Sequence, residues 1–474
     1  MITNISQSAG TILERGLARL ESGDYKSAAA DFSSALAMDR TNAELALVLA
    51  NAQQLAGSVL EARATLATFV AGDPEVSPEQ CYSLGTSLLS LGAPQLALEC
   101  LNPLVSLRPL DPAVLAATAA ACRAAGRPAQ GWKLIKRAIA LDSQKPAYLL
   151  TAAQVRHSLG DMDGAFHWLD RAEMLRPAHG PTRVQRAYTM LLASGGANAA
   201  GWELLESRPL PQPTTQARSW HGQQMNGGSI LVMAEQGVGD QFQFVRFVYR
   251  LREFGAGRIV VQAHPDAVEL FNANGLDAIS RDHPAPVTEW YVPMLSLPHR
   301  LSLGGSSAHT GAHTGSPYLA SERSEYPKAP GSRKLGLVWA GNPEHPGSST
   351  RDIHPVLFLR LFESPGIEWI GLQAGKARHQ APSWLPLAPP TTSWSETASR
   401  LAGLDGLITV DTGIAHLAGA LGVPTWILVE NVPDWRWGLN GDRTPWYDSV
   451  RLVRQPRTGE WAGAVGKLLD LLTT

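Results

Sequence analysis

Two short segments combine glycines with residues that can take part in proton or phosphate chemistry. They are Glu235-Gln-Gly-Val-Gly-Asp240 and Asp411-Thr-Gly-Ile-Ala-His416. Each follows an apolar run that predicts a buried strand and precedes a run that predicts an amphipathic helix. Glycines in such a turn let a ligand approach the backbone closely, and the N-terminus of a helix favours an anion. The two segments are therefore the first candidates for a functional site.

The segment from Asp411 to His416 is the more informative of the two. Free N–H groups of Thr412 and Gly413 at the start of a helix would form a seat for a phosphate or diphosphate. His416 could contact the phosphate or a sugar, and a buried structural histidine is the alternative. Finding these residue types together at the carboxyl end of a strand favours a binding function, because ligands of open α/β sheets bind there.

The segment from Glu235 to Asp240 carries less information. It lacks the GxGxxG spacing of a dinucleotide-binding turn. Glu235, Gln236 and Gly239 are candidates for contacts with a sugar or with the loop. Asp240 could be a catalytic carboxylate or could simply cap the helix that follows. On this motif alone the two interpretations of Asp240 are equally supported.

Two further groups extend the candidate site. Asn342 and Arg351 follow another predicted strand, where a cation could neutralise a leaving diphosphate. The adjacent Asp352 leaves a plain surface salt bridge as the alternative for Arg351. The sequence Asp434-Trp-Arg-Trp437 places Arg436 between Trp435 and Trp437.

The two tryptophans and Arg436 could stack on a sugar or nucleobase. A structural aromatic patch between lobes is the rival interpretation. The sequence has no P-loop, GxSxG or HExxH motif. We therefore expect no metal and no cofactor.

The first part of the chain that must position these residues is repetitive. One glycine recurs every 34 or 35 residues, followed five residues later by a small residue: Gly23, Gly57, Gly92, Gly126, Gly160 and Gly195. This period is typical of two antiparallel helices joined by a tight turn, in which glycine ends the first helix. About six units over residues 11–208 resemble the tetratricopeptide repeat (TPR). Such an array stacks into a solenoid with a groove, which predicts binding of a protein partner rather than a mere spacer or dimerisation role.

After a proline-containing stretch at 209–213, strands alternate with helices. Apolar runs predict strands at 228–234, 258–263, 289–292, 334–340, 367–373, 406–410 and 425–429, with helices that include 242–254 and 355–362. This alternation predicts parallel sheets. We expect a fold of the α + α/β class, in which the solenoid is followed by two Rossmann-like lobes, at 209–325 and 333–474, that face each other across a cleft.

Composition excludes several classes of protein. The net charge of the 474 residues is -2, which argues against a nucleic-acid-binding surface. Cys81, Cys100 and Cys122 lie among apolar helical residues and are expected to be buried free thiols. The sequence shows neither a signal peptide nor an apolar run of about 20 residues, so we expect a cytoplasmic protein without a membrane span.

Longer stretches then suggest a family. AEQGVGDQFQF, LGLVWAGNP, TRDI, LDGLITVDTGIAHLAGALGVPTW, PDWRWG and TPWYDSVRLVRQP together resemble bacterial TPR-linked glycosyltransferases. The catalytic part is similar to the heptosyltransferase-like branch of the GT-B fold. The resemblance implies metal-independent transfer of a sugar from a nucleotide-activated donor. It also implies that Asp240 is the general base, that Asp411, Thr412, Gly413 and His416 bind the donor, and that Arg351 is the basic residue near its phosphates.

Some relatives of this kind resemble flagellin glycosyltransferases. That resemblance implies protein O-glycosylation of Ser or Thr on an acceptor such as flagellin, held by the TPR groove, and a donor such as a CMP-linked nonulosonic acid. The sequence departs from many relatives at Asp352, where they read RSI in place of Arg351-Asp352-Ile353. The alternatives are a glycosyltransferase for lipid or polysaccharide acceptors and an interaction scaffold without activity.

Overall fold

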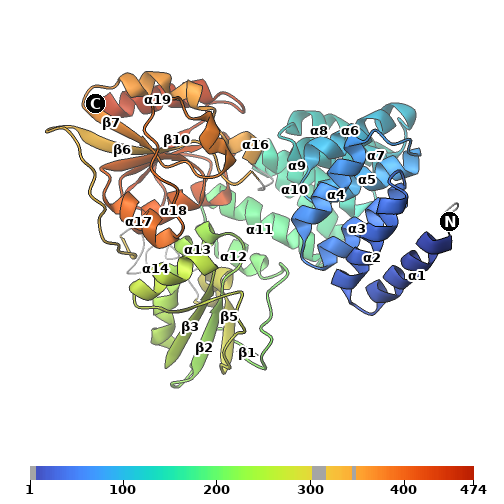
Figure 1. The fold of residues 1–474 in the computed structure, drawn as a ribbon, viewed down its shortest axis with the longest axis horizontal. Helices are drawn as coiled ribbons and strands as arrows, with labels where there is room; N and C mark the ends of the chain where they lie inside the picture. Colours follow the sequence, from blue (N-terminus) through green and yellow to red (C-terminus); the bar gives the residue numbers. More distant parts are fainter. Residues whose placement is uncertain (1–6, 302–316, 344–347, 474) are drawn as a thin grey trace. The chain divides into compact units, whose positions relative to one another are not determined.

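The computed structural model describes residues 7–301, 317–343 and 348–473. Contacts divide the chain into two compact units. The first is built chiefly from the chain up to Arg176, and the second from Pro177–Pro343 and Thr350–Thr474. Figure 1 shows the helices of the first unit in blue to green and the two sheets of the second in yellow-green and orange.

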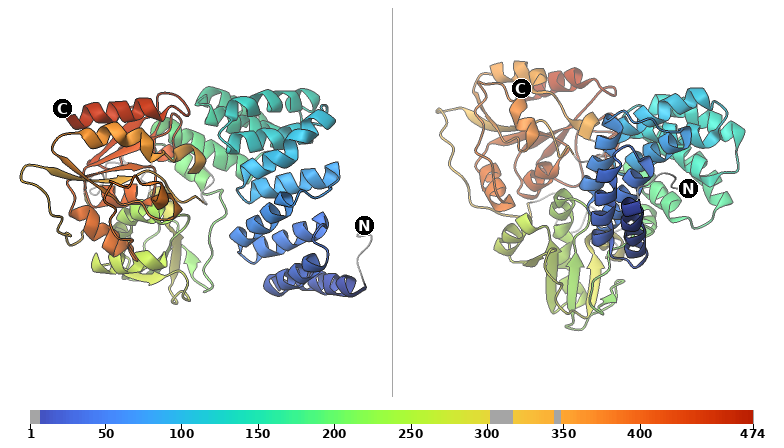
Figure 2. Two further views of the ribbon diagram at one scale, coloured as in Figure 1. Left: turned by 45° about the horizontal axis from the view of Figure 1, so that its top comes forward. Right: turned by 45° about the vertical axis from the view of Figure 1, so that its right-hand side comes forward.

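The described part of the first unit is a stack of paired helices, as Figure 2 shows. The helices are α1 (Gln7–Glu21), α2 (Tyr25–Met38), α3 (Ala43–Leu55), α4 (Val59–Ala71), α5 (Pro78–Ser90), α6 (Pro94–Leu107), α7 (Pro112–Ala124), α8 (Pro128–Leu141), α9 (Pro146–Ser158) and α10 (Met162–Leu175). The glycine that recurs between the helices of each pair has a φ between 73° and 84°. This left-handed conformation costs glycine little, which confirms its predicted role in the turn.

The small residues of the repeat allow the paired helices to approach. Gly16 of α1 faces Phe32 of α2, which is fully buried, and a β-carbon at Gly16 would lie 2.6 Å from the Phe32 ring. Asp31, also buried, ties the same two helices together by accepting hydrogen bonds from Arg15 and Arg19. Packing and a charge pair thus fix the first repeat.

The helices that the spacing assigns to the sixth repeat group with the second unit. They are α11 (Gly180–Ser194) and α12 (Ala199–Leu205), joined at Gly195 with a φ of 61°. Trp202 of α12 is 1% exposed and packs edge-on against Phe244, Trp435 and Trp446. The predicted limits of the three domains remain predictions.

The first sheet of the second unit is parallel throughout, with strand order β1-β5-β2-β3-β4. Its strands are β1 (Arg218–Ser219), β2 (Ser229–Met233), β3 (Arg258–Ala263), β4 (Asp277–Ser280) and β5 (Trp290–Pro293). Between them lie α13 (Val238–Phe244), η1 (Val245–Phe254), η2 (Pro265–Ala267) and α14 (Val268–Ala273), with η3 (Met294–Ser296) and α15 (Leu297–Arg300) after β5.

The second sheet is also parallel, with order β10-β9-β8-β6-β7. Its strands are β6 (Arg333–Val338), β7 (Ile367–Gly371), β8 (Gly406–Val410), β9 (Thr425–Val429) and β10 (Val450–Arg454). Its helices are α16 (Ser348–Arg351), η5 (Pro355–Glu363), η6 (Lys376–Gln380), α17 (Trp394–Ala402), α18 (Gly413–Ala420), η7 (Trp435–Trp437) and α19 (Trp461–Thr473).

The predicted α/β architecture is confirmed, with differences in detail. Two predicted α-helices are wholly or mostly 3₁₀ segments: residues 242–254 divide into α13 and η1, and 355–362 lies in η5. Strands β1, β4 and β10 were not predicted from the sequence. Two parallel sheets place two sets of strand carboxyl ends within one unit, and ligands of open α/β sheets bind at such ends.

Candidate functional site

The two glycine-containing motifs meet in the structure. Gly239, at the start of α13 in the first lobe, lies against the start of α18 in the second. A β-carbon at Gly239 would lie 3.0 Å from His416 Cδ2 and 3.2 Å from Gly413 Cα. Both glycines therefore permit close contact between helices from opposite lobes. The sequence suggested that these glycines let a ligand approach the backbone. In the structure they let the two helices approach each other.

Asp240 is tied to a cation of the other lobe. Its Oδ1 is ion-paired with Nη2 of Arg436, and its Oδ2 accepts a hydrogen bond from the Gly237 N–H at 2.9 Å. The bond to Gly237 is a helix cap, so the capping interpretation describes part of what Asp240 does. Burial raises the pKa of Asp240, and the charge of Arg436 opposes that rise.

Arg436 has a partner for each of its nitrogens. Its Nε donates to Gln243 Oε1 at 2.7 Å and its Nη1 donates to Asp434 Oδ1 at 2.7 Å, in addition to the pair with Asp240. Burial acts to lower the pKa of Arg436, but Asp434 and Asp240 overcome this and raise it. Because Asp240 and Gln243 are on α13 while Arg436 is on η7, the guanidinium joins the two lobes.

His416 is a buried, neutral histidine. Its Nδ1 is 2.8 Å from the Tyr447 hydroxyl, and its ring stacks on Trp437 with a centroid distance of 5.2 Å. Burial lowers the pKa of His416 to about 3. His416 can therefore offer a hydrogen bond at neutral pH but no charge for a phosphate. Its Nε2 lies 4.0 Å from Asp411 Oδ1, which places it beside the predicted donor-binding residues.

Asp411 and Arg351 form a second ion pair. Arg351 Nη1 is 3.4 Å from Asp411 Oδ2 and donates to the Asp411 carbonyl at 3.3 Å. Burial raises the pKa of Asp411, and the charge of Arg351 opposes this. Thr412 is at the N-cap position of α18 but makes no capping hydrogen bond, and its buried hydroxyl has no hydrogen-bond partner among the described residues. An unused donor thus lies at the start of this helix.

The loop after β6 brings its predicted residues to different places. Asn342 is exposed. Asp352 accepts a hydrogen bond from the Gly341 N–H at 2.9 Å, and burial raises its pKa. The acidic residue that departs from the family pattern is therefore tied to the backbone of its own loop, and Arg351 is paired with Asp411 rather than with Asp352 across the surface.

The tryptophans of the DWRW segment are largely covered by protein. Trp435 is 5% exposed and packs against Trp202 and Trp446, while Trp437 is 2% exposed and stacks on His416. A β-carbon at Gly196, in the turn before α12, would lie 3.3 Å from Trp435. This arrangement favours the structural aromatic patch over stacking on a ligand.

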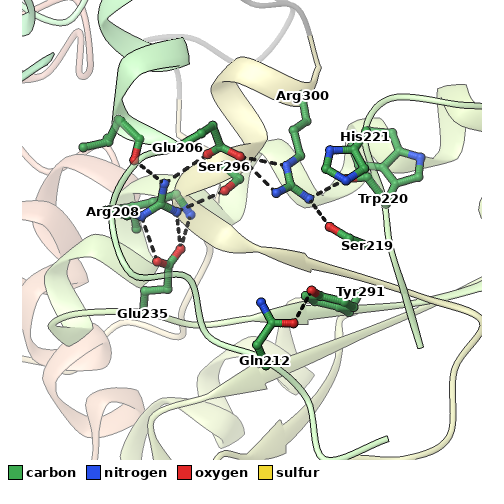
Figure 3. A network of polar contacts seen from close by, with 12 residues as sticks. Glu206, Arg208, Gln212, Ser219, Trp220, His221, Glu235, Tyr291, Ser296 and Arg300 are labelled. Atoms are coloured by element: carbon green, nitrogen blue, oxygen red, sulfur yellow. Dashed lines mark hydrogen bonds and ion pairs between the residues drawn. The ribbon is translucent and has the colours of Figure 1, made fainter. Parts of the chain in front are cut away.

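Glu235 belongs to a different polar network, drawn in Figure 3. Its carboxylate pairs with Arg208 Nη2 at 2.8 Å and accepts from the Leu295 N–H at 3.1 Å. Glu206 pairs with the same arginine and with Arg300. The network holds the segment after α12 to the first lobe, which favours a structural role for Glu235 over contact with a sugar. Gln236 next to it has a φ of 54°, a strained conformation for a residue with a side chain.

Three residues near the site were missed by sequence reasoning. Gln243 is fully buried beside Arg436 and looks like any helix residue. Glu430 directly follows β9, and its place at a strand carboxyl end was the available signal. Burial raises the pKa of Glu430 to about 7, against a hydrogen bond with Thr350 and the charge of Arg351.

The third missed residue is Tyr188 of α11. Burial raises the pKa of its hydroxyl. The charges of Arg436 and Asp434 and a hydrogen bond with Gln236 also act on this pKa, which places Tyr188 close to all three. The repeat spacing placed Tyr188 in a TPR helix, which hid its proximity to the candidate site. Among the described residues, no cluster of three or more His, Cys, Asp or Glu could hold a metal ion.

Comparison with known families finds one match in the helical repeats and one in the second α/β lobe. A profile of the tetratricopeptide repeat matches residues 19–80. A profile of glycosyltransferase family 9 (heptosyltransferase) matches residues 376–459, which include β8, α18 and η7. The protein therefore joins TPR repeats to a glycosyltransferase family 9 domain. The resemblance inferred from the sequence motifs is confirmed at this level.

Individual relatives are distant. Protein FlbA of Caulobacter vibrioides is 22% identical over 82% of this chain and 77% of its own length. Solved structures similar to the chain include a tetratricopeptide repeat protein from Parabacteroides merdae, with a TM-score of 0.36, 16% identity, and coverage of 44% of this chain and 82% of that one. The TPR protein YrrB has a TM-score of 0.30, 19% identity, and coverage of 36% and 88%. In the described residues, none of the helices has the length and apolar character of a membrane span.

Proposed function

We propose that this protein transfers a sugar from a nucleotide-activated donor to Ser or Thr hydroxyls of a protein acceptor bound by its TPR array. The observation that carries the proposal is the meeting of the two motifs in the second unit. Gly239 and Asp240 of one lobe lie beside Gly413, His416 and Arg436 of the other, within a chain that contains a family 9 domain. This meeting supports the proposal, because the residues predicted for proton transfer and those predicted for phosphate binding lie in these two motifs.

The donor would lie at the carboxyl ends of β8 and β9. Thr412 offers an unused hydroxyl there, and the first turn of α18 offers N–H groups. Arg351 would bind the donor phosphate and would give up part of its ion pair with Asp411 to do so. His416 would contact the donor through a hydrogen bond from Nε2, because its ring is neutral and its Nδ1 is engaged by Tyr447. No metal ion is assigned a part in this proposal.

Asp240 would act as the general base. It would accept the proton of the acceptor hydroxyl while the hydroxyl oxygen attacks the anomeric carbon and the bond from sugar to phosphate breaks. General base catalysis contributes roughly 10²–10⁴-fold in rate. The acceptor suggested by the resemblance is flagellin, and the donor it suggests is a CMP-linked nonulosonic acid.

The test is a thermal-shift screen of the full chain against CMP, UDP, GDP, ADP and their sugar conjugates. A nucleotide at about 100 times its dissociation constant should stabilise the protein by about 2.7 kcal/mol. Thr412→Val keeps the side-chain shape and should weaken this stabilisation without lowering the melting temperature of the free protein. Thr473→Val, at an exposed position of α19, is the matched control. Failure of every nucleotide to stabilise the wild-type protein would refute the proposal.

The acceptor is tested separately. The nucleotide sugar selected by the screen is incubated with the protein and purified flagellin, and the mass of flagellin is measured. We expect an increase equal to whole sugar residues, located on Ser or Thr. Donor binding with transfer to lipid or polysaccharide instead, or with no transfer to any acceptor, would favour one of the alternatives.

A further inference from the structure

Both oxygens of the proposed base are occupied in this structure. Asp240 Oδ1 is held by Arg436 and Oδ2 by the Gly237 N–H. A carboxylate paired with a buried cation is a weak base, because the pair favours the ionised form. Burial already raises the pKa of Asp240 in this structure, and the charge of Arg436 limits that rise, so Asp240 becomes a stronger base when Arg436 is drawn to another anion. Burial would then raise the affinity of the carboxylate for a proton further, because the cation no longer opposes it.

The groups around Arg436 indicate which kind of anion could replace Asp240 as its partner. The Nε2 amide of Gln243 is fully buried, and it has no hydrogen-bond partner among the described residues. Its Oε1 accepts from Arg436 Nε at 2.7 Å, so this unused donor lies next to the guanidinium. The unused hydroxyl of Thr412 is in the other lobe. A group with several acceptor oxygens and negative charge would satisfy the Gln243 amide and the cation together.

A phosphate has these properties. Guanidinium binds phosphate through paired, charge-assisted hydrogen bonds, and it does so at least as well as it binds a single carboxylate oxygen. Asp434 would remain on Nη1, because it is the N-cap of the 3₁₀ segment that contains Arg436 and also accepts a hydrogen bond from the Arg436 backbone N–H. Asp240 and Gln243 reach Arg436 from the opposite lobe, and Asp240 is the charged one of the two, so it is the partner that an arriving phosphate would displace.

We propose that Arg436 binds the donor phosphate and that Asp240 is its counter-ion in the free protein. Donor binding moves the guanidinium from Asp240 to the phosphate. The freed carboxylate then accepts the proton of the acceptor hydroxyl, whose oxygen forms the new bond to the sugar. The phosphate leaves with the electron pair of the broken bond, and Arg436 meets its charge. This inference rests on the proposed function, because it assumes a nucleotide-activated donor.

The test measures nucleotide affinity rather than turnover. Dissociation constants for CMP, UDP, GDP and ADP are determined by calorimetry with the full-length wild type, Asp240→Asn, Arg436→Gln and the double variant. Removing the competing carboxylate in Asp240→Asn should tighten binding of the preferred nucleotide by about 10-fold or more. Arg436→Gln should weaken it by about 10- to 100-fold, the range for a hydrogen bond to a charged group. In the double variant, Asp240→Asn should give no gain.

Asp277→Asn is the matched control, because Asp277 forms an exposed pair with Arg258 at 2.9 Å and should not affect affinity. If Arg436→Gln fails to fold, the Asp240→Asn measurement still decides the question. Unchanged or weaker binding by Asp240→Asn would overturn the inference and leave the proposed function standing. Absence of nucleotide binding by the wild type would overturn both.

Discussion

Glu430 shows how burial changes the protonation state of a single residue. Its pKa rises from 4.5 to about 7, because burial opposes the charged form near Asp411 and Asp434. For a carboxyl with a raised folded-state pKa, the folded protein binds more protons than the unfolded chain between these two values. The stability that Glu430 contributes is therefore full below pH 4.5 and is lost as the pH rises through about 7.

Glu430→Gln removes this titration and keeps the shape. At pH 8 the variant should be more stable than wild type by up to about 3 kcal/mol, the equivalent of the change in pKa. At pH 4.5 the two should have the same stability. Urea unfolding at both pH values measures the difference. Burial lowers the pKa of His416, so its contribution to stability decreases as the pH drops below 6.5. This effect is the same in both proteins. An equal stability difference between variant and wild type at the two pH values would therefore contradict the burial of Glu430.

The helix pair of the first repeat depends on one glycine. Gly16→Ala would place a β-carbon 2.6 Å from the Phe32 ring. Because Phe32 is fully buried, the clash should destabilise the first unit by about 1–3 kcal/mol. Gly10→Ala is a matched control in the same helix, since a β-carbon there meets no atom within 4 Å. Thermal unfolding followed by circular dichroism should show a lower melting temperature for Gly16→Ala than for Gly10→Ala. Equal melting temperatures would refute the predicted clash with Phe32.

The contact between α13 and α18 gives a second prediction about an element. Gly239→Ala would force the His416 ring or the Gly413 backbone to move, which should destabilise the second unit by about 1–3 kcal/mol. Gly466→Ala in α19 has open space around its new β-carbon and should stabilise by up to about 1 kcal/mol. Denaturant unfolding of both variants provides the measurement. A neutral Gly239→Ala would mean that the two motifs do not touch in solution.

On the scale of the whole molecule, α11 and α12 belong to the second unit in structure and to the repeat array in sequence. A fragment of residues 177–474 retains Trp202 and Arg208, which pack on η7 and pair with Glu235. A fragment of residues 209–474 lacks both and exposes their partners. We expect the longer fragment to unfold cooperatively and the shorter one to aggregate or to lose its near-ultraviolet circular dichroism. Equal stability of the two fragments would disprove this assignment.

The sequence by itself determined the local structure of this protein. The repeat period predicted the paired helices, because a glycine that recurs at a fixed spacing between apolar helical runs marks the left-handed residue of the turn between them. The apolar runs gave most strands of two parallel sheets, because periodicity and turn residues act over a few neighbours. The motif around Asp411 also indicated the glycosyltransferase family, because its residue types and their order can be recognised in the sequence alone.

Only the tertiary structure decided which distant residues meet. Asp240 and Arg436 are 196 positions apart, and their pairing depends on how two lobes pack. The same packing turned Gly239 and Gly413 into contact points, buried Trp435 and raised the pKa of Glu430. These outcomes follow from long-range burial and charge, which a local pattern does not encode. The chain's repeats and sheets are thus legible in sequence, while the state of its candidate site is a property of the assembled lobes.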